Sequence, residues 1–141
     1  MALLDLLKHR ISIRDFLDRP VERKEIMMCL EAARLAPSAC NSQPWKFIVV
    51  DERQLKDKLG DAAFSGIYSM NSFCKIAPVM VVVVSEKPKF LAKIGGMFRG
   101  TKYCLIDIGG AIEHFVLQAE DLGLGTCWIG WFNEGAVKPI L

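Results

Sequence analysis

The sequence lacks a strong excess of charge and a long hydrophobic run. Its 141 residues carry 18 basic and 16 acidic side chains, for a net charge of +2. Nucleic-acid-binding proteins usually show a basic excess or stripe, so this balance argues against that class. The longest apolar run, residues 77–84, is far shorter than the roughly 20 residues that a membrane-spanning helix needs. Asp5 interrupts the short apolar start, so no signal peptide is expected.

The cysteines and histidines lack the spacing of a metal site or a disulfide framework. There are five cysteines, no pair has CxxC spacing, and the two histidines lie far apart. Reduced thiols in a cytoplasmic protein are therefore expected. No GxGxxG follows a predicted strand, which argues against a built-in nicotinamide domain. No nucleophile–base pair is evident either, so covalent catalysis is not predicted.

The chain does contain enough apolar residues for a core. Its length fits a single domain over residues 1–141. Hydrophobic residues make up 52% of the chain, slightly above the usual share for globular proteins. We interpret the excess as surface that is buried against another subunit.

The hydrophobic pattern predicts both helices and strands. Helical spacing predicts helices over residues 1–9, 20–36, 52–64 and 102–122, and a short one beginning at residue 134. Strands are predicted at 46–51 and 79–85, the second buried on both faces because polar residues do not alternate along it. A third strand is expected after residue 123. Residues 65–75 fit a helix or a loop, and 86–100 are expected to form an excursion over the surface.

Two features of the long helix call for a structural or functional explanation. The pair Gly109-Gly110 is unfavourable in a helix, which predicts close backbone packing at that point. His114 lies beside the apolar stripe, where a packed or surface histidine is the more common use. After the helix, Trp128 and Trp131 fit either the lining of a ring pocket or aromatic core packing.

A short segment near the start, Arg10-Ile-Ser-Ile-Arg14, alternates with period two. In an extended conformation Arg10, Ser12 and Arg14 lie on one face, and the two isoleucines lie on the other. Two guanidinium groups beside a hydroxyl suit a phosphate monoester. A half-buried segment with a solvated charged face explains the same pattern, and both interpretations stay open from these residues alone.

The chain is organised around residues 36–47, APSACNSQPWKF. This stretch ends a predicted helix and leads into a strand, and its Pro, Ser and Asn residues interrupt regular structure. The amides of Asn41 and Gln43 carry both donors and an acceptor, which match the edge of a flat heteroaromatic ring. We interpret the stretch as a ligand loop for a flavin. A plain helix stop before a strand remains the alternative.

Four separated motifs resemble the nitroreductase family of FMN enzymes. They are R-x-S-x-R near the start, P-S-x-x-N-x-Q-P-W after the first long helix, A-P-V-x-V-V-V, and G-L-G-T-x-W-I-G. They stand in the order found in that family, and the resemblance covers nearly the whole chain. It implies an α+β fold with a central mixed, largely antiparallel sheet flanked by helices. It also implies a homodimer in which two FMN molecules lie in grooves between the subunits.

The resemblance implies a cofactor-binding role for eleven residues and no side-chain acid–base catalyst. Three hold the FMN phosphate and ribityl end, five come from the opposite subunit to cover or neighbour the ring, two match a turn beside its reactive edge, and one matches a flavin-contacting asparagine. In that order they are Arg10, Ser12, Arg14; Pro37, Ser38, Ala39, Asn41, Gln43; Ile129, Gly130; and Asn71. No metal ligands are implied.

The activity implied by the resemblance is that of an FMN-dependent oxidoreductase. Two electrons pass from NAD(P)H through flavin N5 to a small planar acceptor, such as a nitroaromatic, a quinone or a free flavin, in a ping-pong cycle. Reductive dehalogenation, flavin breakdown and a non-catalytic flavin-binding module are the alternatives. Family members usually continue beyond the last motif into a tail that crosses to the partner, so either this sequence is incomplete or the protein is a trimmed member of the family.

Overall fold

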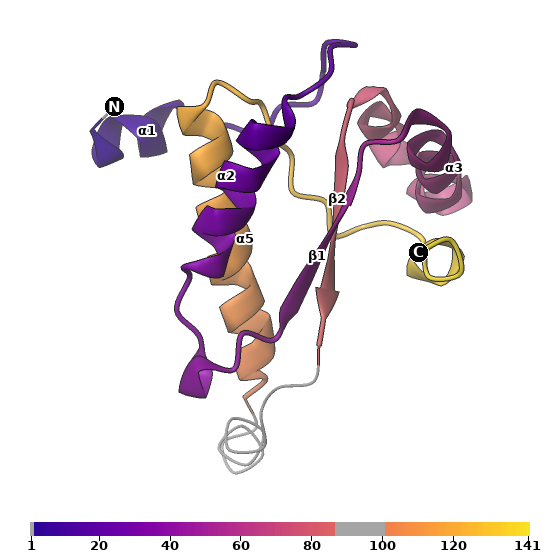
Figure 1. Ribbon diagram of the computed structural model, residues 1–141. Helices are drawn as coiled ribbons and strands as arrows, with labels where there is room; N and C mark the ends of the chain where they lie inside the picture. The colour runs from indigo at the N-terminus through magenta and orange to yellow at the C-terminus, as the bar shows by residue number, and fades with distance from the viewer. Residues whose placement is uncertain (1, 87–100) are drawn as a thin grey trace. The chain divides into compact units, whose positions relative to one another are not determined.

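The computed structural model describes residues 2–86 and 101–141. In these residues helices outnumber strands, and the two strands pair in a small antiparallel sheet (Figure 1). The elements in chain order are α1 (Leu3–His9), α2 (Arg23–Arg34), the 3-10 helix η1 (Ala39–Asn41), β1 (Trp45–Val50), α3 (Arg53–Ala63), the 3-10 helix η2 (Gly66–Ile76), β2 (Met80–Ser85), α5 (Tyr103–Asp121) and α6 (Glu134–Val137). The fold is therefore of the α+β class.

The contacts divide the chain into two compact units. The first unit comprises residues 1–10, 22–48 and 82–124, and the second comprises residues 11–21, 49–81 and 125–141. Two of the five boundaries between the units fall within the strands, one falls just before the GTCWIG stretch, and the other two follow Arg10 and Val21. The prediction of one domain over residues 1–141 stays a prediction.

The first unit is built on the packing of α2 against α5, which lie side by side in Figure 1. Ala33 of α2 and Ala111 of α5 are completely buried, and their small side chains let the two helices approach closely. The rings of Phe47 and Phe115 stack against this cluster with centroids 5.9 Å apart. The core of this unit therefore lies between α2 and α5 and includes Ala36, at the start of the loop that joins α2 to β1.

The second unit is built on α3, which contacts η2 and α6. Leu59 of α3 and Val50 at the end of β1 are almost fully buried, and Cys74 of η2 and Val137 of α6 are buried as well. Gly60 lies where a Cβ would come within 3.1 Å of the Met80 side chain, so this glycine allows close packing. These contacts give η2 and α6 a fixed support.

Local side chains explain where two of the helices begin. Glu22 and Glu25 form a reciprocal capping box at the start of α2. The Glu52 carboxylate accepts hydrogen bonds from the backbone N–H groups of Gln54 and Leu55 at the start of α3. In both helices the first N–H groups find partners, which fixes the N-terminus.

Most of the elements expected from the sequence are confirmed. Helices occur in each of the five predicted ranges, although α2 is shorter than the predicted 20–36 because its capping box places the start at residue 23. The strands at 46–51 and 79–85 correspond to β1 and β2. The undecided range 65–75 is the 3-10 helix η2. The excursion predicted over 86–100 lies, apart from Glu86, outside the described residues.

Four expectations were wrong. β2 is half-buried at residues 80–83 and exposed at 84–85, because burial on both faces requires elements that cover both. The expected third strand is reduced to one isolated bridge between Thr126 and Ser12. A Cβ at Gly110 would meet nothing within 4 Å, so close packing does not explain that glycine, whereas close packing at Gly109 stays a prediction. Core packing does not apply to Trp128 and Trp131, since both are 53% exposed.

No helix of the described ranges, 2–86 and 101–141, is long and apolar enough to cross a membrane. All five cysteines are free thiols.

Candidate functional site

The R-x-S-x-R segment crosses from the first unit to the second. Arg10, at the end of α1, belongs to the first unit, where its Nε lies 4.0 Å from a carboxylate oxygen of Glu113 on α5. Both side chains are partly exposed, so this ion pair is weak. Ser12 and Arg14 belong to the second unit.

In the second unit the R-x-S-x-R segment pairs with the GLGT segment. Ser12 forms a parallel bridge with Thr126, and the Ile13 N–H donates to the Thr126 carbonyl at 2.8 Å. A Cβ on Gly125 would lie 2.9 Å from Cγ1 of Ile13, closer than packed carbon atoms tolerate. Glycine at this position therefore permits the pairing of two motifs that are more than one hundred residues apart.

The pairing leaves polar side chains of the segment in solvent. Ser12 and Arg14 are exposed, whereas Ile13 between them is half-buried, as the period-two pattern predicts. Ile11 departs from the pattern, since it is 59% exposed. Within residues 2–86 and 101–141, the side chains of Ser12 and Arg14 have no hydrogen-bond or ion-pair partner. A hydroxyl and a guanidinium group on a fixed extended backbone are thus available to an anion.

The loop of residues 37–43 has an unusual backbone. Three residues that are not glycine have positive φ angles: Cys40 (53°), Asn41 (49°) and Gln43 (45°). Each such residue costs on the order of 1–3 kcal/mol, and the cost persists only where the surrounding structure holds the conformation. Clusters of this kind are typical of ligand-binding loops. A plain helix stop does not require three of them.

Several hydrogen bonds hold the loop. The Ala39 N–H donates to both carboxylate oxygens of Asp107 on α5, at 3.1 and 3.2 Å. The Gln43 N–H donates to the Ser38 hydroxyl at 2.9 Å, and the Gln43 side chain donates to the carbonyl of Arg34 at 3.4 Å. The Gln43 amide is thus turned back toward α2. Pro37 and Asn41 are exposed, and Ser38 and Ala39 are half-buried.

Asn71 reaches the second half of the GLGTCWIG motif. Its side-chain amide donates to the Trp131 carbonyl at 2.8 Å, and the Trp131 indole packs against the ring of Tyr68 with centroids 5.1 Å apart. Ile129 is half-buried, and a Cβ on the exposed Gly130 would meet nothing within 4 Å. The Asn71 amide therefore holds the backbone at Trp131, which directly follows Ile129 and Gly130.

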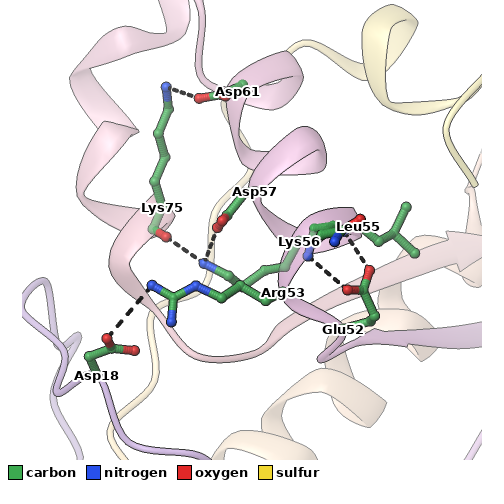
Figure 2. Close-up of polar contacts among 9 residues, drawn as sticks. Asp18, Glu52, Arg53, Leu55, Lys56, Asp57, Asp61 and Lys75 are labelled. Atoms are coloured by element: carbon green, nitrogen blue, oxygen red, sulfur yellow. Dashed lines mark hydrogen bonds and ion pairs between the residues drawn. The ribbon is translucent and has the colours of Figure 1, made fainter.

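Figure 2 shows the polar network that holds η2 against α3. The buried ammonium of Lys56 donates to the Lys75 carbonyl and to the Asp57 carboxylate, both at 2.8 Å. The Lys75 ammonium in turn donates to Asp61 at 2.8 Å. The hydrogen bond from Lys56 lowers the pKa of Asp57 below its usual value. Because Lys75 lies near the end of η2, the network fixes the element that carries Asn71.

Replacing Lys56 with methionine is expected to lower the free energy of unfolding by about 1–2 kcal/mol, because the Lys75 carbonyl loses a charged donor. The matched control is Lys58→Met on the exposed face of the same helix, which should change stability by less than about 0.5 kcal/mol. Urea unfolding of both variants measures the difference. Equal losses in the two variants would mean that the network does not hold η2.

The two buried thiols of the described residues are not activated nucleophiles. Burial raises the pKa of the Cys29 and Cys74 thiols to about 11, so both stay protonated near neutral pH. The His114 ring nitrogen lies 3.1 Å from the carbonyl of Ala32, and this contact orients the imidazole within the packing of α2 and α5. No three metal-ligating side chains come together in the described part of the chain.

The structure thus brings the predicted residues together in two groups. The loop residues 37–43 form one group in the first unit, and Ser12, Arg14, Asn71, Ile129 and Gly130 lie in the second unit along the GLGTCWIG stretch. Arg10 belongs to neither group, since it lies in the first unit beside Glu113. Sequence reasoning missed Asp107 and Thr126. The position of Asp107 directly before Ile108, in the apolar stripe of the long helix, was a signal, because a buried carboxylate needs a hydrogen-bond donor.

The sequence model of the nitroreductase family matches residues 7–70 and 68–141. The chain belongs to the nitroreductase family. This assignment confirms the resemblance predicted from the four motifs.

Known relatives and solved structures agree with the family. A Methanothermobacter thermautotrophicus protein with the provisional name NADH dehydrogenase/NAD(P)H nitroreductase is 34% identical over 92% of this chain and 61% of its own length. An FMN reductase [NAD(P)H] of Bacillus subtilis is 28% identical over 92% of this chain and 53% of its own. An iodotyrosine deiodinase of Thermotoga neapolitana is 25% identical over 88% and 71%.

Solved structures of the family superpose well on this chain. A nitroreductase family protein from Clostridium novyi gives a TM-score of 0.80 at 31% identity, over 99% of this chain and 75% of the other. An FMN-dependent nitroreductase from Clostridium difficile gives 0.76 at 28% identity, over 98% and 77%. The chain spans 61% and 53% of the first two relatives named above.

Proposed function

We propose that this protein is an FMN-dependent NAD(P)H oxidoreductase. The observation that carries the proposal is the pairing of Ser12 with Thr126, which places the exposed Ser12 and Arg14 side chains beside the GLGT stretch. Family membership and two relatives named for FMN support it. When bound, FMN supplies two-electron transfer from NAD(P)H to a small planar acceptor such as a nitroaromatic, a quinone or a flavin, in a ping-pong cycle.

The residues present fit such a cofactor. A phosphate monoester needs strong donors on a rigid frame, and the Ser12 hydroxyl and Arg14 guanidinium meet that need, because the bridge to Thr126 fixes their backbone. Arg10 can add a third donor, since its only ion pair in the described residues is the 4.0 Å contact with Glu113. The positive φ angles of the 37–43 loop are typical of backbone held for a ligand.

Each group of residues has its own task in this proposal. Arg10, Ser12 and Arg14 bind the phosphate and ribityl end. The loop residues Pro37, Ser38, Ala39 and Asn41 cover the ring, with Gln43 as their neighbour. Ile129 and Gly130 present backbone to the ring edge, where an N–H group stabilises developing negative charge, and Asn71 supports that turn. No side chain acts as an acid or base.

A homodimer with shared active sites is part of the proposal. Several large apolar side chains of the first unit are more than half exposed, namely Leu3 and Leu4 of α1 and Leu105 and Ile106 of α5. Exposed apolar residues on neighbouring helices are typical of surface that a partner subunit covers. In a dimer, the 37–43 loop of one subunit covers the flavin that is anchored by the arginines of the other.

Dehalogenation is the second candidate reaction. It is favoured by one observation, the relative named iodotyrosine deiodinase. Residues 86–100, for which the sequence predicts an excursion over the surface, lie outside the described residues apart from Glu86. Steady-state assays with halophenols and with nitroaromatics, each at matched enzyme concentration, distinguish the two reactions.

The visible spectrum of the purified protein tests the proposal. A yellow protein with a flavin band is expected, either as purified or after addition of FMN, and it should elute at the size of a dimer. Anaerobic addition of NADH or NADPH should bleach that band. A protein that stays colourless with excess FMN contradicts the proposed function. A band that no nicotinamide bleaches supports a non-catalytic flavin-binding module instead.

A further inference from the structure

Asp107 of α5 has an unusual environment for a carboxylate. The residue is only 9% exposed, and no lysine or arginine of residues 2–86 and 101–141 forms an ion pair with it. Both of its oxygens accept from the Ala39 N–H, 68 residues away in the chain. A buried carboxylate is costly, and a neutral acceptor would also satisfy one N–H group. Compared with a neutral acceptor, the carboxylate forms a stronger, charge-assisted hydrogen bond.

The position of this bond in the loop is informative. Ala39 is the first residue of η1, and the side chain of the preceding residue, Ser38, does not cap η1 but accepts from the Gln43 N–H. Asp107 therefore supplies from α5 the acceptor that the start of η1 lacks locally. The next two residues, Cys40 and Asn41, are in the left-handed conformation. The carboxylate thus anchors the loop just before its strained part.

From this geometry we propose that Asp107 is a positioning residue for flavin binding. Its carboxylate holds the Ala39 end of the 37–43 loop to α5 and so keeps the loop in the conformation that covers the isoalloxazine ring. The proposal rests on the proposed function, because it assumes that this loop contacts the flavin. Asp107 itself does not touch the cofactor.

The test compares FMN with riboflavin, which has the same ring but no phosphate. Asp107→Ala is expected to weaken the binding of both ligands by the same factor, about tenfold, because the loop contacts the ring. Asp107→Asn should weaken both about threefold, since its amide oxygen still accepts from Ala39. Asp121→Asn, the same change at the exposed end of the same helix, should stay within about twofold of wild type.

The measurements are dissociation constants from flavin fluorescence, together with thermal unfolding of the flavin-free proteins. A merely structural role would lower the unfolding temperature and leave the affinity of the folded protein unchanged, and that result would overturn the proposal. A loss confined to FMN would also overturn it. If Asp107→Ala does not fold, the affinities of Asp107→Asn for FMN and riboflavin test the proposal. Wild-type affinities in that variant would refute the positioning role. A wild-type protein that binds neither ligand would instead refute the proposed function and this role with it.

Discussion

Replacing Arg14 with alanine is expected to weaken FMN binding about 10- to 100-fold and to leave protein stability nearly unchanged. The guanidinium group is exposed and has no ion-pair partner among the described residues, so the fold loses little when it is removed. A charged hydrogen bond to the FMN phosphate is worth about 1.5–3 kcal/mol, which corresponds to the expected range of affinities. Riboflavin lacks the phosphate, so its affinity should change by less than about threefold.

The matched control is Arg19→Ala. Arg19 is another exposed arginine. It follows the R-x-S-x-R segment and lies beyond the bridge between Ser12 and Thr126. Titration of the wild type and both variants, in flavin-free form, with FMN and with riboflavin, followed by flavin fluorescence, gives the dissociation constants. Equal FMN affinity in Arg14→Ala and wild type would identify Arg14 as part of an ordinary solvated face. An equal loss of affinity for both ligands would indicate that Arg14 contacts the flavin ring and not the phosphate.

Replacing Gly125 with alanine is expected to destabilise the protein by about 1–3 kcal/mol. The new Cβ would lie 2.9 Å from Cγ1 of Ile13 and 3.2 Å from Cβ and Cγ2, and the β-branched side chain has little freedom to move away. Separation of the two segments would break the hydrogen bond from Ile13 to Thr126 and release Ser12 from its bridge. FMN affinity should therefore fall together with stability.

A double-mutant cycle isolates this contact. Ile13→Ala removes Cγ1 and Cγ2, which include the nearest atom to the new Cβ, and keeps only the Cβ at 3.2 Å, so Gly125→Ala should cost less in that background than in the wild type. Gly135→Ala serves as the control, because the nearest atom to its Cβ, Oδ1 of Asn133, lies at an ordinary 3.6 Å. Urea unfolding measures all four proteins and the control. Additive effects of the two substitutions would show that Gly125 and Ile13 do not press against each other.

Local patterns predicted the elements well and the contacts between distant segments poorly. The apolar stripe of α5 and the capping glutamates of α2 depend on residues a few positions apart, so both helices could be predicted from the sequence. The GLGTCWIG stretch was expected to form a strand because of its flanking pattern. It pairs only at Thr126 in the described residues, because a strand also requires a second segment that hydrogen-bonds to it over several consecutive residues.

The two contacts that constrain the candidate site most strongly could not be predicted from the sequence either. Nothing in the sequence near Ala39 indicates that its N–H meets a carboxylate 68 residues later, and nothing near Ile13 indicates why residue 125 is a glycine. Both are contacts between segments whose proximity depends on the whole fold. They were found only from the structure.

By itself, the sequence determined the family, the α+β class and the residues to suspect, because motif order and hydrophobic period are properties of the chain alone. Only the tertiary structure decided how those residues are held. Packing of α2 on α5 places Asp107 against the strained 37–43 loop, and the pairing of Ile13 with Thr126 leaves Ser12 and Arg14 in solvent. The physical reason is that burial and hydrogen-bond satisfaction depend on every segment that surrounds a residue, not on its neighbours in sequence.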